Sequence, residues 1–116
     1  MPAANNSVPD WLSSGDQLVK FFDALSNPLR IKIMGILYQN RQYVSELARL
    51  VNISRPLLYM HLRKLESANL IKGNHEISED GKAMKYYEIQ QLDLHVNPKL
   101  LFELSKSVTI KQDLEG

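Results

Sequence analysis

The sequence predicts a mainly α-helical fold that carries one small β-hairpin, an α+β arrangement. Two observations predict it. Within residues 44–70, apolar residues recur at helical spacing on both sides of Asn52. After residue 70 the apolar period shortens toward two, as in β-strands, and an Asp-Gly turn signal follows. The expected order is helix, helix, short strand, helix, helix, two strands and helix.

Length and composition fit one domain that can bury a core. The chain has 116 residues, of which 44% are hydrophobic and 23% charged, and it contains no cysteine. Disulfides and thiolate metal sites are thereby excluded, and a cytoplasmic location is expected. The sequence contains no stretch of roughly 20 apolar residues that could span a membrane. We expect a flexible tail over residues 1–9 and a single domain over residues 10–112.

The first helix is expected to begin at Asp10 or Asp16, because apolar residues follow at helical spacing from Leu18. Trp11 and Leu12 precede this pattern, and two large apolar side chains are unusual so close to a terminus. Two alternatives are open for them: they fold back on their own domain, or they pack on another subunit.

The second helix is predicted from Asn27-Pro28 to about Gln39, with Asn27 as the N-cap and Pro28 in the first turn. Gly35 within it would permit a close helix crossing. Tyr43 and Val44 are expected to form a short strand, and Ser45 to cap the next helix.

Residues 44–70 predict a helix-turn-helix. Asn52 occupies the turn, where the chain needs a residue that tolerates the left-handed conformation. Ser54 can then cap the second helix, with Pro56 in its first turn. Leu58, Leu62 and Leu65 share one face of that helix and are expected in the core. The second helix of such a motif enters the DNA major groove.

Residues 71–89 predict a hairpin that turns at Glu79-Asp80-Gly81-Lys82. A hairpin directly after the second helix forms a wing, so the fold is a winged helix-turn-helix. Lys82 and Lys85 are placed to contact phosphates, and the acidic tip is expected to tilt away from them.

The last helix is predicted from Asn97-Pro98, and its apolar residues, continuing to Val108 and Ile110, cover more than one face. The same helix of a second copy, together with residues 11–25, would cover this excess. A two-fold homodimer is therefore predicted. Its expected interface consists of Trp11, Leu12, Leu18, Phe22, Leu101, Leu104 and Val108.

Charge is distributed unevenly along the chain. Residues 41–75 contain six basic and two acidic residues, whereas the net charge of the whole chain is +1. A local basic surface on a nearly neutral chain is what contact with DNA phosphates requires. The alternative is a solvated surface that binds nothing.

The candidate DNA-contacting residues lie mainly on the second helix of the motif. Arg55 and Tyr59 are expected to contact bases, because arginine can pair with guanine O6 and N7. Met60 favours a thymine methyl contact or recognition of DNA shape. The remaining candidates are assigned to phosphates or to the groove-facing turn: Ser54, Pro56, Arg63, Lys64, Arg41, Lys82 and Lys85. The alternatives are solvated charges for the arginines and packing against the wing for Tyr59.

Four segments, LSNPLRIKIMGIL, VSELARLVNIS, LYMHLRKLESANLI and GKAMKYYEI, resemble the ArsR-type winged-helix transcription regulators, and more broadly the MarR-type regulators. The resemblance covers about two thirds of the chain, from Asp23 to Ile89. It implies a homodimer joined through the first and last helices. It also implies binding to a palindromic operator, usually as a repressor.

The chain departs from the family's metal-sensing patterns. Glu46 to Leu50 stand where many members have a Cys-x-Cys pair. Asp93 and His95 form half of another member type's site, but Lys106 and Thr109 occupy the expected partner positions. No metal or cofactor is therefore expected.

The remaining histidines do not suggest catalysis. His61 is expected to be a structural histidine at the border of the core, and His75 to lie on a strand surface. With no phosphate loop and no paired carboxylates, an enzyme is not expected. The alternative to a DNA-binding regulator is a winged helix that binds proteins in a transcription or chromosome-associated complex. Trp11, Met60 and the acidic wing tip favour that alternative.

Overall fold

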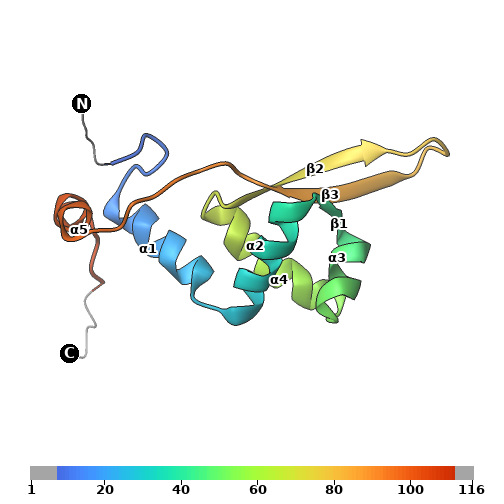
Figure 1. Cartoon of the computed structure of the whole chain (residues 1–116), viewed down its shortest axis with the longest axis horizontal. Helices are drawn as coiled ribbons and strands as arrows, with labels where there is room; N and C mark the ends of the chain where they lie inside the picture. Colours follow the sequence, from blue (N-terminus) through green and yellow to red (C-terminus); the bar gives the residue numbers. More distant parts are fainter. Residues whose placement is uncertain (1–7, 112–116) are drawn as a thin grey trace. The chain divides into compact units, whose positions relative to one another are not determined.

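The computed structural model describes residues 8–111, and the chain divides into two compact units. One unit contains residues 21–92, and the other contains the described residues 8–20 and 93–111. The elements follow the predicted order (Figure 1): α1 Gly15–Leu25, α2 Pro28–Gln39, β1 Gln42–Tyr43, α3 Val44–Val51, α4 Arg55–Ser67, β2 Ile71–Ile77, β3 Ala83–Ile89 and α5 Pro98–Ser105. Of the predicted tail, residues 1–7 lie outside the described residues.

The core of residues 21–92 lies where α2, α3 and α4 meet the base of the hairpin. The helical spacing of the leucines on α4 places one face of that helix inward. As predicted, Leu58, Leu62 and Leu65 are fully buried. They are joined by Ile33 and Leu37 from α2, Leu47 from α3, and Ile71 and Tyr87 from the strands. Each such side chain contributes roughly 1.5–3 kcal/mol by leaving water.

The predicted start of α2 is confirmed. Asn27 is extended, and its Oδ1 accepts hydrogen bonds from the backbone N–H groups of Leu29 at 2.9 Å and Arg30 at 3.3 Å. Pro28 occupies the first turn, where its missing N–H costs no helical bond. The expected role of Gly35 is wrong, because this residue is exposed and a Cβ atom there would meet nothing within 4 Å.

The junction between β1 and α3 differs from the prediction. The strand is Gln42–Tyr43, and α3 begins at Val44 with Tyr43 at the N-cap position. No side chain caps this helix, so the predicted cap at Ser45 is wrong. The reason is tertiary: Gln42 and Tyr43 pair with Tyr87 and Tyr86 of β3, and this ladder holds the chain extended up to the first helical residue.

The turn between α3 and α4 has the predicted geometry. Asn52 is left-handed, with φ 57° and ψ 50°, and its N–H bonds back to the carbonyls of Ala48 and Arg49. Ser54 then caps α4, since its Oγ accepts a hydrogen bond from Leu57 N at 3.3 Å. The end of α3 and the start of α4 therefore lie at the residues that the sequence singled out, Asn52 and Ser54.

The three strands form an antiparallel sheet in the order β1-β3-β2. The hairpin turns where expected, and Gly81 adopts φ 84°, a conformation that side chains disfavour. Asp80 stabilises the turn by accepting hydrogen bonds from the Ser78 hydroxyl and from Lys82 N. These bonds hold the pKa of the Asp80 carboxyl below its usual value. The acidic tip thus has a structural role.

In the other unit, Leu12, Leu18, Leu100 and Leu104 form a buried cluster, against which Trp11 and Leu94 pack. Trp11 and Leu12 thus fold back on their own chain, and their assignment to a subunit interface stays a prediction. α1 begins at Gly15, beyond the expected Asp10 and just before Asp16. The Gly15 N–H donates to Ser107 Oγ at 2.7 Å.

The predicted cap of α5 is confirmed, since Asn97 Oδ1 accepts from Leu100 N at 2.8 Å. The predicted extent of this helix is wrong. It ends at Ser105, so Val108 and Ile110 lie beyond it. Asp16 of α1 binds the chain there by accepting from Thr109 N at 2.8 Å, which also lowers the pKa of the Asp16 carboxyl.

Candidate nucleic-acid interface

The face of α4 that points away from the core combines apolar and basic side chains. At about 100° per residue, the middle of this face lies opposite the buried leucines and holds Pro56, Met60 and Ser67, with Arg63 beside them. All four residues are exposed, and 56% of Met60 is accessible to solvent. Tyr59 lies closer to the core and is half-buried. Within the described residues, therefore, no other element covers this face of α4, and it is accessible to a binding partner.

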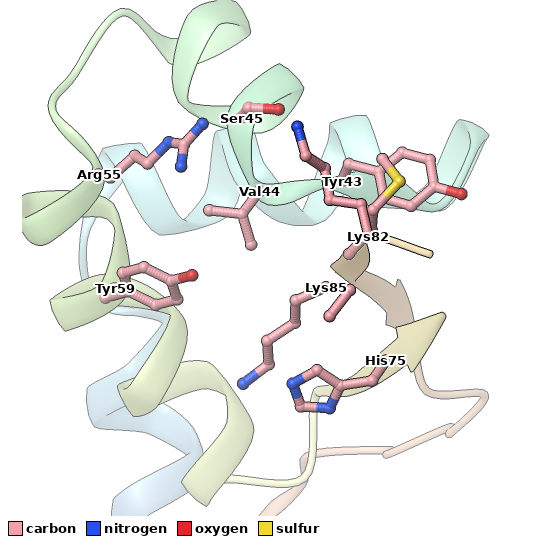
Figure 2. A pocket seen from close by; sticks show the side chains of 10 residues that line it. Tyr43, Val44, Ser45, Arg55, Tyr59, His75, Lys82 and Lys85 are labelled. Carbon is pink, nitrogen blue, oxygen red and sulfur yellow. The ribbon is translucent and has the colours of Figure 1, made fainter. Parts of the chain in front are cut away.

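An open pocket with a volume of about 670 Å³ lies between the start of α4, the start of α3 and the hairpin. Figure 2 shows Arg55 and Tyr59 extending from α4 on one side, and His75, Lys82 and Lys85 on the hairpin side. Tyr43, Val44, Ser45, Ala83 and Met84 complete the lining. The structure therefore brings together four predicted site residues: Arg55 and Tyr59 from α4, and Lys82 and Lys85 from the hairpin.

His75 is a pocket residue that the sequence placed only on a strand surface. It lies directly opposite Lys85 in the β2–β3 ladder, and its ring lies beside that lysine in the pocket (Figure 2). Once the hairpin register is known, this pairing follows from the alternation of side chains along a strand. Hydrogen bonding to Tyr87 raises the pKa of Lys85, so its amino group remains cationic.

Arg41 is bound within the base of the wing. Its guanidinium lies 4.1 Å from the centre of the Tyr86 ring and 3.4 Å from a carboxylate oxygen of Glu76. The Tyr43 hydroxyl donates to the other oxygen of Glu76, and this bond, followed by the charge of Arg41, lowers the pKa of Glu76. Arg41 is still partly exposed, but a phosphate would compete with this local partner.

The other cations fall into two groups. Lys64 forms an ion pair with Asp23 at 2.8 Å, and this hydrogen bond lowers the pKa of the Asp23 carboxyl. The side chains of Arg55, Arg63 and Lys82 take part in no ion pair with any residue of 8–111. These three charges are therefore available to an external anion without breaking an internal contact.

Arg30 is a buried cation that the sequence analysis missed. Only 9% of it is exposed, and it donates from Nε to Ala24 O at 2.7 Å and from Nη2 to Asp23 O at 3.2 Å. Its Nη1 lies 3.2 Å from Nδ1 of His61 on α4, so Nδ1 is the acceptor. The available signal was helical spacing, because residue 30 shares the buried face of residues 33 and 37.

His61 is confirmed as a structural histidine. Burial, and then the charge of Arg30, lowers its pKa. Because Nδ1 accepts from Arg30, protonation of that nitrogen would remove the acceptor and place two cations together. His61 and Arg30 thus connect α4 to the end of α1 through a neutral imidazole.

Asp93 and His95 lie in the connection between β3 and α5, as expected. No group of three or more histidine, cysteine or carboxylate side chains that could hold a metal exists among residues 8–111. Over the same range, no helix is long and apolar enough to cross a bilayer.

The predicted interface residues differ in their exposure. Leu12, Leu18 and Leu104 are buried within their own chain, with Trp11 packed against them. Phe22, Leu101 and Val108 remain between 37% and 44% exposed. The exposed members are available for a partner, and the buried ones support the unit from within.

Comparison with known proteins identifies the family. The model of the arsR family of bacterial regulatory proteins matches residues 27–72, which contain α2, α3 and α4. The uncharacterized HTH-type transcriptional regulator MJ0229 of Methanocaldococcus jannaschii is 36% identical over 87 residues, covering 75% of this chain and 90% of that protein.

Solved structures show the same fold. A crystallised ArsR family transcriptional regulator is 27% identical, with a TM-score of 0.57, over 67% of this chain and 75% of its own. An NMR structure from Mycobacterium bovis, described as the homodimeric winged helix-turn-helix DNA-binding domain of a possible ArsR-family regulator, is 21% identical. It has a TM-score of 0.57 over 78% of this chain and 74% of its own. Together with the capped helices, the left-handed turn and the hairpin, these matches show that the chain belongs to the ArsR family of winged helix-turn-helix transcription regulators.

Proposed function

We propose that this protein is a cytoplasmic, non-enzymatic repressor that binds a palindromic DNA operator as a homodimer. In this proposal α4 enters the major groove and the hairpin contacts the neighbouring phosphate backbone. The family membership supports the general function, and the geometry of α4 and the pocket supports the assignment of roles.

The observation that carries the proposal is the group of Arg55, Arg63 and Lys82. Arg63 lies on the exposed face of α4, Arg55 and Lys82 line the pocket between α4 and the hairpin, and none of the three forms an ion pair with another described residue. A phosphate contact therefore gains charge neutralisation and releases counterions without the loss of an internal salt bridge. We assign Arg55 to a base, through its two-donor guanidinium, and Lys82 to a phosphate.

Two observations support the homodimer. Leu101, Phe102 and Val108, in the unit of residues 8–20 and 93–111, are 37–60% exposed, which is an unusual amount of apolar surface for a lone subunit, and Phe22 of the other unit is 39% exposed. The related Mycobacterium bovis domain is described as homodimeric. Two copies of α4 related by a two-fold axis would match half-sites about one helical turn apart.

The first test is selection of bound duplexes from a random DNA pool, with the mass of the protein in solution measured alongside. We expect a dimer and an enriched inverted repeat whose affinity falls by orders of magnitude as salt rises from about 50 to 200 mM. Binding that is insensitive to salt, or no enrichment by a folded dimer, would instead favour the protein-interaction alternative, which the exposed Met60 and the acidic wing tip suggest.

The second test compares Arg55→Ala with Lys99→Ala, which removes an exposed charge on α5. We expect Arg55→Ala to cost about 1–3 kcal/mol on the selected sequence and to relax base preference. Lys99→Ala should leave affinity and preference nearly unchanged. Equal losses on selected and scrambled DNA would show that Arg55 contacts only the backbone.

A further inference from the structure

The middle of the exposed face of α4 is apolar, although its flanks are basic. Met60 lies nearly opposite the buried leucines and is 56% exposed, and Pro56 precedes it by one turn. Arg63 and Ser67 are the polar members of this face. The one carboxylate within α4, Glu66, is half-buried and lies near Lys85 rather than on this face.

This set of side chains limits which bases the middle of the face can distinguish. Adenine is recognised in the major groove by asparagine or glutamine, and cytosine by a carboxylate. The outward face of α4 carries neither type. Arginine can recognise guanine, and an apolar side chain can recognise the methyl group of thymine. The thioether of methionine is flexible and polarisable, so it can follow the position of such a methyl group.

The charges around this apolar surface favour DNA over an apolar protein as its binding partner. At 1.5 Å and about 100° per residue, Arg55 lies about 7.5 Å before Met60 along the axis and about 140° around the helix from it, at the end of α4 that lines the pocket. Arg63 lies about 4.5 Å after Met60 and about 60° around from it. Neither arginine forms an ion pair within the described chain. An apolar protein partner would have to bury or displace these unpaired charges, whereas a DNA groove presents anions at both edges and bases between them.

We propose that Met60 is a specificity-determining residue that contacts the 5-methyl group of a thymine in each half-site. The inference rests on the proposed DNA-binding function and adds the base that the middle of α4 recognises. Arg55 and Arg63 hold the helix against the flanking phosphates and guanines, and Met60 then excludes water from the thymine methyl.

The test uses the full-length protein and the duplex that it selects, synthesised either with thymine or with deoxyuracil, which lacks only the 5-methyl group. We expect the wild-type affinity to fall about fourfold for each contacted methyl, the equivalent of one buried methylene. Met60→Ala should bind the thymine duplex more weakly and should no longer distinguish it from the deoxyuracil duplex.

Ile31→Ala is the matched control, because Ile31 is an apolar side chain of similar exposure, 52%, on α2. It should retain the full preference for thymine. A further variant, Met60→Gln, should shift the selected base at this position from thymine toward adenine, since glutamine pairs with adenine N6 and N7.

The results distinguish a failure of the Met60 proposal from a failure of the proposed DNA-binding function. Equal affinity of the wild type for both duplexes would overturn the proposal, as would a thymine preference that persists in Met60→Ala. Salt-sensitive binding to both duplexes would leave the proposed DNA-binding function intact in either case. If the folded protein selected no duplex from the random pool, the proposed function itself would be wrong, and this inference with it.

Discussion

The buried guanidinium of Arg30 offers the most direct test of how α4 is held in place. Arg30→Met retains much of the side-chain length but removes all donors. The hydrogen bonds to the carbonyls of Asp23 and Ala24 would be lost, together with the contact to His61. Ala24 is 1% exposed, so water cannot readily replace the guanidinium at its carbonyl.

The expected magnitude follows from these three contacts. A hydrogen bond from a charged donor contributes roughly 1.5–3 kcal/mol, and a buried acceptor left without a partner carries a comparable penalty. Part of this loss is offset, because the charged group no longer has to be buried. We therefore expect Arg30→Met to lower the free energy of unfolding by about 2–4 kcal/mol, a large share of the 5–15 kcal/mol of an ordinary domain.

Urea unfolding followed by circular dichroism measures this change, provided that the m-value stays constant. Lys32→Met is the matched control, because Lys32 lies on the same helix but is exposed, and it should stay within about 0.5 kcal/mol of the wild type. A loss below about 1 kcal/mol in Arg30→Met would show that water or other groups satisfy these acceptors, and our account of how α4 is anchored would be wrong.

Two further predictions concern pH and glycine. Because the pKa of His61 is lowered in the folded protein, the unfolded chain binds the proton first, so the free energy of unfolding should fall as the pH drops below about 6.5. His61→Gln, which can still accept from Arg30, should flatten this dependence in urea titrations; an unchanged pH profile would assign the effect to other groups. Gly15→Ala places a Cβ against Leu104 O and the Val108 side chain, and it should cost about 1–3 kcal/mol in thermal unfolding. Gly35→Ala, in open space on α2, should instead stabilise by about 0.5–1 kcal/mol, and equal effects of the two changes would contradict the packing around Gly15.

Local signals in the sequence were sufficient for most helix boundaries. Asn27, Ser54 and Asn97 each precede a proline in the first turn, and each accepts the backbone hydrogen bond expected of an N-cap. Asn52 takes the left-handed conformation for which its side chain is suited. These features depend only on residues within one turn of each other, so they could be predicted without knowledge of the tertiary structure.

The features that were mispredicted depend on distant partners. Ser45 does not cap α3 because β1 is held by β3, some 40 residues further along the chain. α5 stops at Ser105, and the chain beyond it is bound by Gly15 and Asp16 of α1. Arg30 is buried because carbonyls of α1 and a histidine of α4 converge on it. Hydrophobic periodicity reports only local spacing, so it cannot predict these hydrogen bonds between distant segments.

For the candidate site, the sequence could predict the exposed face of α4, because a helical face follows from spacing alone. It could not predict that Arg41 is bound by Glu76 and Tyr86, or that Lys64 is bound by Asp23. Both pairs join segments far apart in the chain. The assignments of Arg41 and Lys64 to phosphates remain predictions, now with an internal competitor for each charge.

The sheet order leaves the hairpin supported by a third strand at its base and unsupported by one toward its tip. β1 supports β3 only at Tyr86 and Tyr87, next to the contact of Arg41 with Glu76 and the Tyr86 ring. From Tyr86 to Gly81, over about 17 Å at 3.3 Å per residue, β2 and β3 pair with no third strand (Figure 1), and Arg41 and Tyr43 bind this stretch through Glu76, which lies opposite Met84. Bending should therefore be concentrated in the outer half of the hairpin, while its base moves with the start of α3. Lys82 lies near the tip and can therefore adjust to the curvature of a DNA backbone. Lys85 lies near the base, so its distance to α4 should change little.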